Sequence, residues 1–288
     1  MMISWDTAIY CLIGHPISKS LSPIIHNNYF NLIGKNNIYL TFDVEEEDLE
    51  MVVNTLKILN IKGFNVTLPH KIKIMEYLDE IDSAAKMIGA VNTVKNENGK
   101  LIGYNTDGIG FLKSLEMLKI NIENKTALIL GSGGAANAIS TSLAIAGAKK
   151  IFINNRSLSK AKILAEKIKK QFPEIIVDYG GLELNNICKD EIDIVINCTS
   201  VGMFPNIDET PIKFDGFSKE LIVYDVIYKP IKTKFLQLAE DRGYFAIGGL
   251  SMLINQALCS QNIWLNDEHN NINENFYKIE GILKSHVE

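Results

Sequence analysis

Residues 126–154 read TALILGSGGAANAISTSLAIAGAKKIFIN, in which two apolar runs flank a glycine-rich segment and a helical pattern. Each apolar run has the length and composition of a strand buried on both faces of a parallel sheet. Between the runs, Ile139, Leu143 and Ala146 recur at helical spacing, and Gly147 is placed to end the helix. The segment therefore predicts a strand, a crossover helix and a second parallel strand in succession.

The same alternation continues toward the C-terminus. Helical spacing recurs over residues 161–168, and further strands are predicted at residues 175–177, 192–196 and 221–226. Because strands and helices alternate, we expect a doubly wound Rossmann-type sheet over residues 108–248.

Residues 1–107 are predicted to form a separate α/β lobe. We expect strands at residues 8–13, 39–44, 63–67 and 90–94, and helices after Ser22, Glu45 and His70. Residues 249–288 contain two helical patterns, which we expect to complete this first lobe. The fold class is therefore α/β with two lobes, and a cleft is expected between them.

Composition excludes several classes of protein. A chain of 288 residues with 47% hydrophobic content is long enough for about two compact units. Its net charge of -5 provides no basic surplus for binding nucleic acid. No membrane partner is expected, because glycines and polar residues interrupt the uncharged stretch 126–148. The N-terminus lacks the basic segment and apolar run of a secretory signal, so we expect a cytoplasmic protein.

The cysteines predict neither a disulfide framework nor a metal site. Cys11, Cys188, Cys198 and Cys259 are scattered, without a CxxC pair and without a histidine at metal-ligand spacing. Four reduced thiols and no metal are therefore expected.

The glycine-rich segment has the G-x-G-x-x-A pattern of a dinucleotide-binding loop, following a strand and opening a helix. Gly131 permits the tight turn, Gly133 allows the backbone to approach a pyrophosphate, and Ala136 lets the helix pack closely. The helix N-terminus offers unpaired N–H groups to the phosphates. The candidate cofactor-binding residues of this loop are Gly131, Ser132, Gly133, Gly134 and Ala135.

The residues after the second strand indicate which dinucleotide binds. A loop specific for NAD has an acidic residue there, whereas this chain has Asn155, Arg156 and Ser157, with Lys160 one turn later. A guanidinium binds a 2′-phosphate through charge-assisted hydrogen bonds, so NADP is the expected cofactor. The alternative is that Arg156 is a solvated residue at a helix start and that the glycines form a simple turn.

Further motifs extend over nearly the whole chain, from Gly14 to Gln256. They are GHPI at 14–17, SLSP at 20–23, FNVTLPHK at 64–71, GAVNT at 89–93, NTDG at 105–108, NCTSVGM at 197–203, YDVIYKP at 224–230 and GLSMLINQ at 249–256. In this set and order the chain resembles the shikimate dehydrogenase family, which includes the shikimate/quinate dehydrogenases. The resemblance implies an oxidoreductase of the chorismate pathway of aromatic amino-acid biosynthesis. Its reaction would be reversible hydride transfer from NADPH to 3-dehydroshikimate, giving shikimate.

The resemblance also implies roles for individual residues. Lys71 and Asp107 match the family's catalytic pair, in which a lysine ammonium would protonate and stabilise the developing alkoxide. Which of the two residues carries the proton stays open, as does the alternative that Lys71 is a solvated lysine. The residues that match substrate-binding positions are Ser20, Ser22, Asn65, Thr67, Asn92, Tyr228 and Gln256. Ser22 followed by Pro23 equally fits a plain helix cap.

On the cofactor side, the family positions add Thr199, Met203, Gly249 and Met252 to the loop residues. Methionines are more often core residues, which is the alternative for both of them. Asp225 is expected to support a strand end. The resemblance implies that residues 1–107, completed by residues 249–288, form the substrate-binding and catalytic domain. Residues 108–248 would then form the NADP-binding domain.

Three alternatives to this assignment stay open. A quinate/shikimate dehydrogenase would accept an extra ring hydroxyl and use NAD or NADP. A regulator of the same fold would bind NADP without catalysis, because fold alone does not establish activity. A folate-linked NADP dehydrogenase is the most distant. The expected partner is a small-molecule substrate, shikimate or 3-dehydroshikimate, and a homodimer is the assembly considered.

Overall fold

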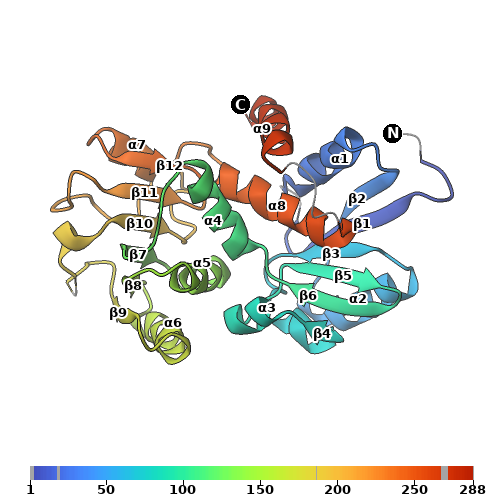
Figure 1. The fold of residues 1–288 in the computed structure, drawn as a ribbon, viewed down its shortest axis with the longest axis horizontal. Helices are drawn as coiled ribbons and strands as arrows, with labels where there is room; N and C mark the ends of the chain where they lie inside the picture. Colours follow the sequence, from blue (N-terminus) through green and yellow to red (C-terminus); the bar gives the residue numbers. More distant parts are fainter. Residues whose placement is uncertain (1–2, 18–19, 186, 267–271, 288) are drawn as a thin grey trace. The chain divides into compact units, whose positions relative to one another are not determined.

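The computed structural model describes residues 3–17, 20–185, 187–266 and 272–287. The chain forms two compact units. Within the described residues, unit 1 contains residues 3–110 and 254–286, and unit 2 contains residues 111–253. Each unit has one sheet, which is six-stranded within the described residues (Figure 1).

The sheet of unit 2 is parallel throughout, which confirms the doubly wound arrangement predicted from the sequence. Its strand order is β12-β11-β10-β7-β8-β9. The strands are β7 (Thr126–Leu130), β8 (Lys150–Asn154), β9 (Ile176–Gly180), β10 (Ile194–Asn197), β11 (Ile222–Asp225) and β12 (Phe245–Ile247).

Alternate residues of β7 face two separate cores. Ala127 and Ile129 pack on one face with α5 (Gly134–Ile145) and α6 (Leu158–Gln171). Leu128 and Leu130 belong to the core of the other face, which includes residues of α7 (Lys234–Glu240). Because both faces are covered, β7 is apolar throughout rather than alternating.

Unit 1 has a mixed sheet in the order β2-β1-β3-β5-β6-β4. Its strands are β1 (Ala8–Gly14), β2 (Asn37–Asp43), β3 (Gly63–Val66), β4 (Glu80–Ile81), β5 (Thr93–Glu97) and β6 (Lys100–Tyr104). β1 is parallel to β2 and β3, whereas β5 is antiparallel to β3 and β6. The helices of this unit's N-terminal part are α1 (Ser22–Leu32), α2 (Leu49–Ile58) and α3 (Ser83–Ile88), with 3-10 turns η1 (Glu46–Asp48) and η2 (Lys73–Tyr77).

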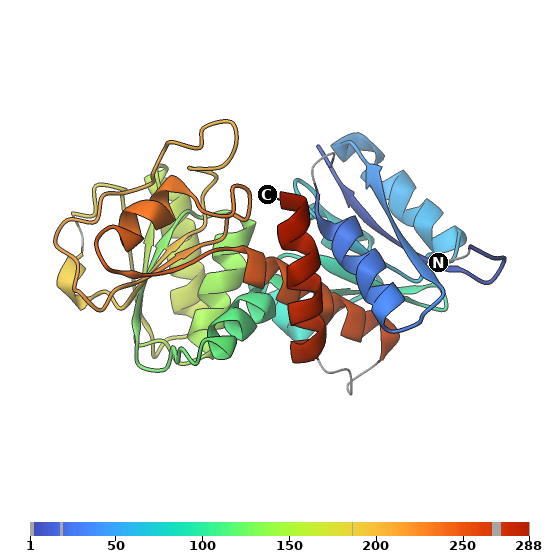
Figure 2. The ribbon, with the colours of Figure 1, turned by 90° about the horizontal axis from the view of Figure 1, so that it is seen from above.

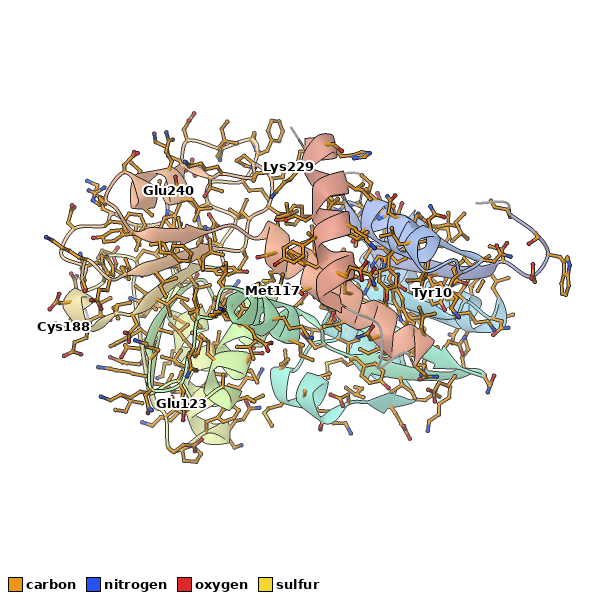
Figure 3. The ribbon with its side chains drawn as sticks, turned by 45° about the horizontal axis from the view of Figure 1, so that its top comes forward. Tyr10, Met117, Glu123, Cys188, Lys229 and Glu240 are labelled. Carbon is orange, nitrogen blue, oxygen red and sulfur yellow. The ribbon has the colours of Figure 1, made fainter. Side chains whose placement is uncertain are left out.

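The chain ends with two helices, α8 (Leu250–Leu265) and α9 (Ile272–Val287). The second boundary between the units falls within α8, after Leu253. The boundary near residue 110 falls within α4 (Asp107–Met117). Trp264 of α8 joins Tyr10 of β1, labelled in Figure 3, at 5.0 Å between ring centroids. Tyr10 also contacts Phe30 of α1 at 5.1 Å, so α1 and α8 cover one face of this sheet (Figure 2).

Three local predictions for unit 1 were wrong. The expected strand at residues 90–94 begins only at Thr93. Asn92 still exchanges backbone hydrogen bonds with Val66 and Tyr104, but the N–H of Val91 donates to Lys71 O at 2.8 Å instead. The helix expected after His70 is only the short 3-10 turn η2. Ser22 is the first helical residue of α1 rather than its cap, and Leu21 occupies the cap position without a side-chain hydrogen bond.

The cysteines are free, and Cys188, labelled in Figure 3, is exposed. Among the helices of the described residues, none combines the length and the apolar composition needed to cross a membrane.

Two glycines of unit 1 give a matched stability prediction. A Cβ on Gly63 would collide with the indole of Trp264, which is buried and donates a hydrogen bond to Val94 O at 2.9 Å. We expect Gly63→Ala to lower the free energy of unfolding by about 1–3 kcal/mol, the usual cost of overpacking. Urea unfolding followed by tryptophan fluorescence measures this, because Trp5 and Trp264 both belong to unit 1.

The control is Gly281→Ala in α9, where an added Cβ would meet no atom within 4 Å. Alanine has the higher helix propensity, so this variant should gain about 1 kcal/mol. If both substitutions changed the free energy of unfolding equally, the collision with Trp264 would not be the cause of the loss in Gly63→Ala.

Candidate active site

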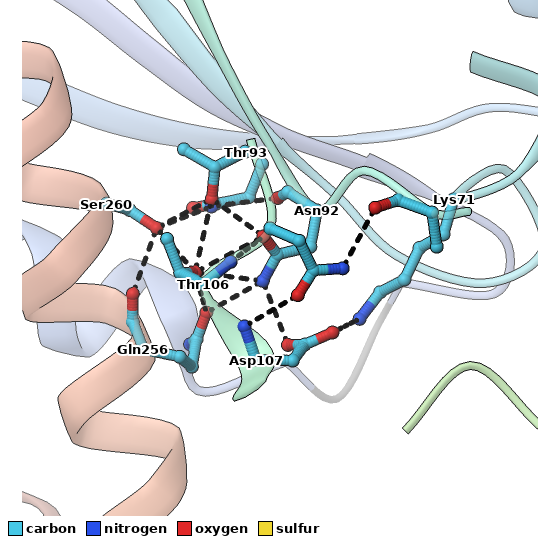
Figure 4. Close-up of polar contacts among 10 residues, drawn as sticks. Lys71, Asn92, Thr93, Thr106, Asp107, Gln256 and Ser260 are labelled. Atoms are coloured by element: carbon cyan, nitrogen blue, oxygen red, sulfur yellow. Dashed lines mark hydrogen bonds and ion pairs between the residues drawn. The ribbon is translucent and has the colours of Figure 1, made fainter. Parts of the chain in front are cut away.

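Lys71 and Asp107 form an ion pair in unit 1. Lys71 lies in the turn between β3 and η2, and Asp107 is the first residue of α4. The Nζ atom of Lys71 is 2.6 Å from Oδ2 of Asp107, and the two side chains are only 20% and 11% exposed (Figure 4). Shielding from solvent makes such a pair stronger and better oriented than a surface salt bridge.

Neighbouring amides hold Asp107 in this position. Asn92 donates from Nδ2 to Oδ1 of Asp107 at 2.9 Å. The backbone N–H of Asp107 donates to Oδ1 of Asn105 at 3.0 Å, and Asn105 donates to Ala90 O at 3.0 Å. Each carboxylate oxygen of Asp107 therefore has a defined partner: Oδ1 accepts from Asn92, and Oδ2 faces the ammonium of Lys71.

Asn65 of β3 lies in the same buried network but supports it from inside the core. Its Oδ1 accepts a hydrogen bond from the Tyr39 hydroxyl at 2.7 Å. Its Nδ2 has three acceptors for its two N–H groups, Asn92 O, Thr93 Oγ1 and Ser260 Oγ, all at 3.0–3.1 Å. The protein itself therefore supplies partners for both amide atoms of Asn65.

Of the other predicted substrate residues of unit 1, Gln256 contacts this group. Gln256 of α8 has its Oε1 3.5 Å from Nδ2 of Asn92. Ser20 accepts at Oγ from the N–H of Ser22 at 3.2 Å, and Thr67 directly follows β3. Within the described part of the chain, no hydrogen bond joins Ser20, Ser22 or Thr67 to Lys71 or Asp107.

Tyr228 is the exception among the predicted substrate residues, because it belongs to unit 2. It follows β11 in the segment 226–230 and is half-buried. Burial raises the pKa of its phenol above the ordinary value.

The glycine-rich loop of unit 2 connects β7 to α5 as the sequence predicts. Gly131 has φ of +111°, a conformation that favours glycine, and an added Cβ would lie 3.1 Å from the Cys198 backbone. Gly133 caps α5, and an added Cβ there would meet nothing within 4 Å. Ser132 lies between these glycines, and Gly134 and Ala135 begin the helix, so their backbone N–H groups belong to its first turn.

Two exposed cations follow β8. Arg156 precedes the cap residue Ser157 of α6, and Lys160 lies in the first turn of that helix. Asn155 braces this turn by donating from Nδ2 to Ser157 O at 3.0 Å. Neither cation forms an ion pair with any residue that the structure describes. Free cations beside the end of a parallel strand fit the 2′-phosphate of NADP.

Of the remaining predicted cofactor residues, Thr199 and Met203 follow β10, whereas Gly249 follows β12 and Met252 lies in the first turn of α8. Thr199 donates from Oγ1 to Asn197 Oδ1 at 2.7 Å, and Met203 is 46% exposed. Gly249 touches the backbone of Val226 so closely that a Cβ would not fit. Met252 is only 7% exposed and packs in the core with α5 and α6, which favours the alternative that it is a core residue.

Asp225, at the end of β11, connects these segments. Its Oδ1 accepts from Asn197 Nδ2 and from the Ile227 N–H, each at 3.1 Å, and its Oδ2 accepts from the Thr233 hydroxyl at 2.6 Å. Burial raises the pKa of this carboxyl to about 6. Its role is to fix the loops that carry Thr199 and Tyr228.

Sequence reasoning missed five residues of the unit 1 network: Tyr39, Thr93, Asn105, Thr106 and Ser260. Ser260 follows Gln256 by one helical turn on the same face of α8, so its spacing was a usable signal. Tyr39 and Thr93 look like ordinary strand residues, and only tertiary contacts reveal their partners. No group of three metal-ligating side chains occurs among the residues described.

Comparison with known proteins identifies the family. A model of the shikimate dehydrogenase substrate binding domain matches residues 12–94, and a model of the shikimate / quinate 5-dehydrogenase family matches residues 114–205. The shikimate dehydrogenase (NADP(+)) of Caldanaerobacter subterraneus subsp. tengcongensis is 48% identical over 265 residues, which cover 92% of this chain and 94% of the relative.

Solved structures agree as well. A crystal structure of a shikimate dehydrogenase in complex with NADP+ has a TM-score of 0.90 and 43% identity, covering 97% of both chains. The shikimate 5-dehydrogenase of Listeria monocytogenes, solved with shikimate and NAD, has a TM-score of 0.91 and 36% identity over 98% of both chains. With an extensive match at this level of identity, the chain belongs to the shikimate dehydrogenase family.

Proposed function

We propose that the protein catalyses the NADP-dependent, reversible reduction of 3-dehydroshikimate to shikimate. The observation that carries this proposal is the shielded ion pair between Lys71 and Asp107, at 2.6 Å. It supports acid catalysis at a ketone, because an ammonium group stabilises a developing alkoxide and protonates it. The family membership supports the choice of substrate and cofactor.

The chain's own residues suggest how the steps divide. NADPH supplies the hydride when bound. Lys71 would donate from Nζ to the ketone oxygen of the substrate, and Asp107 would orient that ammonium group and neutralise its charge. In the reverse direction the same pair would accept the proton of the alcohol. Gln256 would offer a neutral amide to a ring hydroxyl, which suits a polyol without imposing charge. Asn92 would bind a ring hydroxyl by exchanging one of its two N–H partners, Thr106 Oγ1 or Asp107 Oδ1, for the substrate.

We further infer that unit 1 binds the substrate and that unit 2 binds NADP. In unit 1, Ser20, Ser22 and Thr67 would provide hydroxyl donors for the substrate's carboxylate and hydroxyl groups. In unit 2, the open space at Gly133 and the exposed Arg156 and Lys160 fit the pyrophosphate and the 2′-phosphate. Thr199, Met203 and Gly249 would line the cofactor, and Tyr228 stays a predicted substrate-binding residue.

The decisive experiment measures initial rates with shikimate and with quinate, each with NADP and with NAD. We expect shikimate with NADP to give the highest kcat/KM. Comparable turnover of quinate would favour the broader enzyme. Binding of NADPH with no change in nicotinamide absorbance for either acid would favour a regulator. The homodimer and the cytoplasmic location stay predictions, and light scattering of the purified protein tests the first.

Removing the ammonium group tests the assignment of Lys71. We expect Lys71→Ala to lower kcat by about 10²- to 10⁴-fold, the usual contribution of one acid–base group. The matched control is Lys57→Ala, because Lys57 also forms an ion pair, with Asp79 at 2.9 Å, but on the exposed surface of unit 1. The control should keep its activity, and near-normal turnover of Lys71→Ala would remove Lys71 from the mechanism.

Reversing one charge tests the assignment of Arg156. Arg156→Asp removes a donor for the 2′-phosphate and adds repulsion, so the ratio of kcat/KM for NADP over NAD should fall at least about tenfold. The control is Lys169→Asp, which makes the same charge change on the exposed last turn of α6. An unchanged ratio in Arg156→Asp, or an equal fall in the control, would show that Arg156 does not select the cofactor.

A further inference from the structure

Three buried hydroxyl groups lie behind the ion pair, and we call them the hydroxyl cluster: Thr93, Thr106 and Ser260. All three residues are fully buried, with 0% exposure. The Oγ1 of Thr93 is 2.8 Å from Ser260 Oγ and 3.3 Å from Thr106 Oγ1, and the last two are 3.3 Å apart. Three separate segments therefore meet at this cluster: β5, the residues before α4, and α8.

Each hydroxyl of the cluster has one proton and several acceptors within reach. Ser260 Oγ lies 3.0 Å from the carbonyl of Gln256 and 3.1 Å from Asn65 Nδ2, which donates to it. Thr93 Oγ1 accepts from the same Asn65 amide at 3.0 Å and lies 3.0 Å from Asn92 Oδ1 and 2.8 Å from Ser260 Oγ, so either Thr93 or Ser260 donates along the contact between them. The cluster thus links the core amide Asn65 to the site amide Asn92.

The contacts with Asn92 fix which way its amide points. Asn92 Oδ1 accepts from the backbone N–H of Thr106 at 2.8 Å, and Nδ2 donates to Thr106 Oγ1 at 3.0 Å (Figure 4). The second N–H of Nδ2 is then directed at Asp107 Oδ1 at 2.9 Å. A flipped amide would instead turn an oxygen toward the carboxylate, which repels it.

We propose that Thr106 is a positioning residue for the reaction, acting through Asn92. Its hydroxyl accepts from the Asn92 amide, whose other N–H holds Asp107 against Lys71. This inference rests on the proposed function, since it assigns Thr106 a part in the same proton transfer. Thr106 itself is fully buried and adjoins Asp107 in sequence, so it would tune the geometry without touching the reacting atoms.

Two substitutions separate the hydroxyl from the shape of the side chain. Thr106→Val keeps the shape and loses the hydroxyl, so kcat for shikimate oxidation should fall about tenfold, as for one lost buried hydrogen bond. KM for NADP should stay within about twofold, because the change lies in unit 1. Thr106→Ser keeps the hydroxyl and should retain most of the wild-type kcat. Equal losses in both variants would overturn the role of the hydroxyl.

The matched control is Thr141→Val in α5. Thr141 is also fully buried, and its hydroxyl donates to Asn137 O at 2.8 Å within the helix. This variant removes one buried hydroxyl from unit 2 and should leave kcat near the wild-type value. A loss of kcat equal to that of Thr106→Val would mean that any buried hydroxyl has this effect, which would overturn the proposal.

A double-mutant cycle with Asn92→Ala tests the route. If Thr106 acts through Asn92, adding Thr106→Val to Asn92→Ala should change kcat by less than about twofold. A full further tenfold loss would show that Thr106 acts by another path and would overturn the proposal. Wild-type protein that does not oxidise shikimate would instead contradict the proposed function. If the wild-type protein oxidises shikimate and Thr106→Val is equally active, only the positioning role of Thr106 is contradicted.

Discussion

Strand direction is the constraint on which both groups of site residues depend, through parallel pairing in unit 2 and through a mixed sheet in unit 1, where the antiparallel β5 begins at Thr93, beside the ends of β3 and β6. Parallel strands end at one edge of a sheet, so residues far apart in sequence are brought together there. Thr67 and Lys71 follow β3, which pairs in parallel with β1. Gly131, Arg156 and Thr199 follow β7, β8 and β10, which are parallel neighbours in the other sheet. The loops supply the chemistry, and the strands determine where each loop starts.

A second constraint acts inside unit 1, where polar groups are buried and must be hydrogen-bonded. Amides and hydroxyls can each donate and accept, so a small set of them satisfies itself without water. Asn65, Asn92 and Thr106 do this between β3, β5 and α4. The network also orients the carboxylate of Asp107, because Asn92 holds Oδ1 while Oδ2 faces the ammonium of Lys71.

Sequence periodicity predicted unit 2 better than unit 1, for a physical reason. The crossover units of unit 2 are contiguous in sequence, and strands buried on both faces have an unmistakable apolar pattern. The hairpin of β5 and β6 was missed, although Asn98 and Gly99 at its turn, with φ of 54° and 92°, are a recognised hairpin signal. Lys71 and Asp107 were reached through family motifs, whereas the partnership of Thr93 with Ser260 depends on tertiary contacts that no local pattern encodes.

The two units contain the same local arrangement with different outcomes. In each unit, an asparagine donates from Nδ2 to an aspartate: Asn92 to Asp107, and Asn197 to Asp225. The Oδ1 of the same asparagine accepts from the N–H and the hydroxyl of a threonine, which is Thr106 in unit 1 and Thr199 in unit 2. Asp225 has a hydroxyl as its further side-chain partner, and burial raises its pKa to about 6. Asp107 instead faces the ammonium of Lys71 and retains some exposure. A neutral partner and complete burial suit a carboxyl that braces loops, whereas a cationic partner near solvent suits one that serves proton transfer.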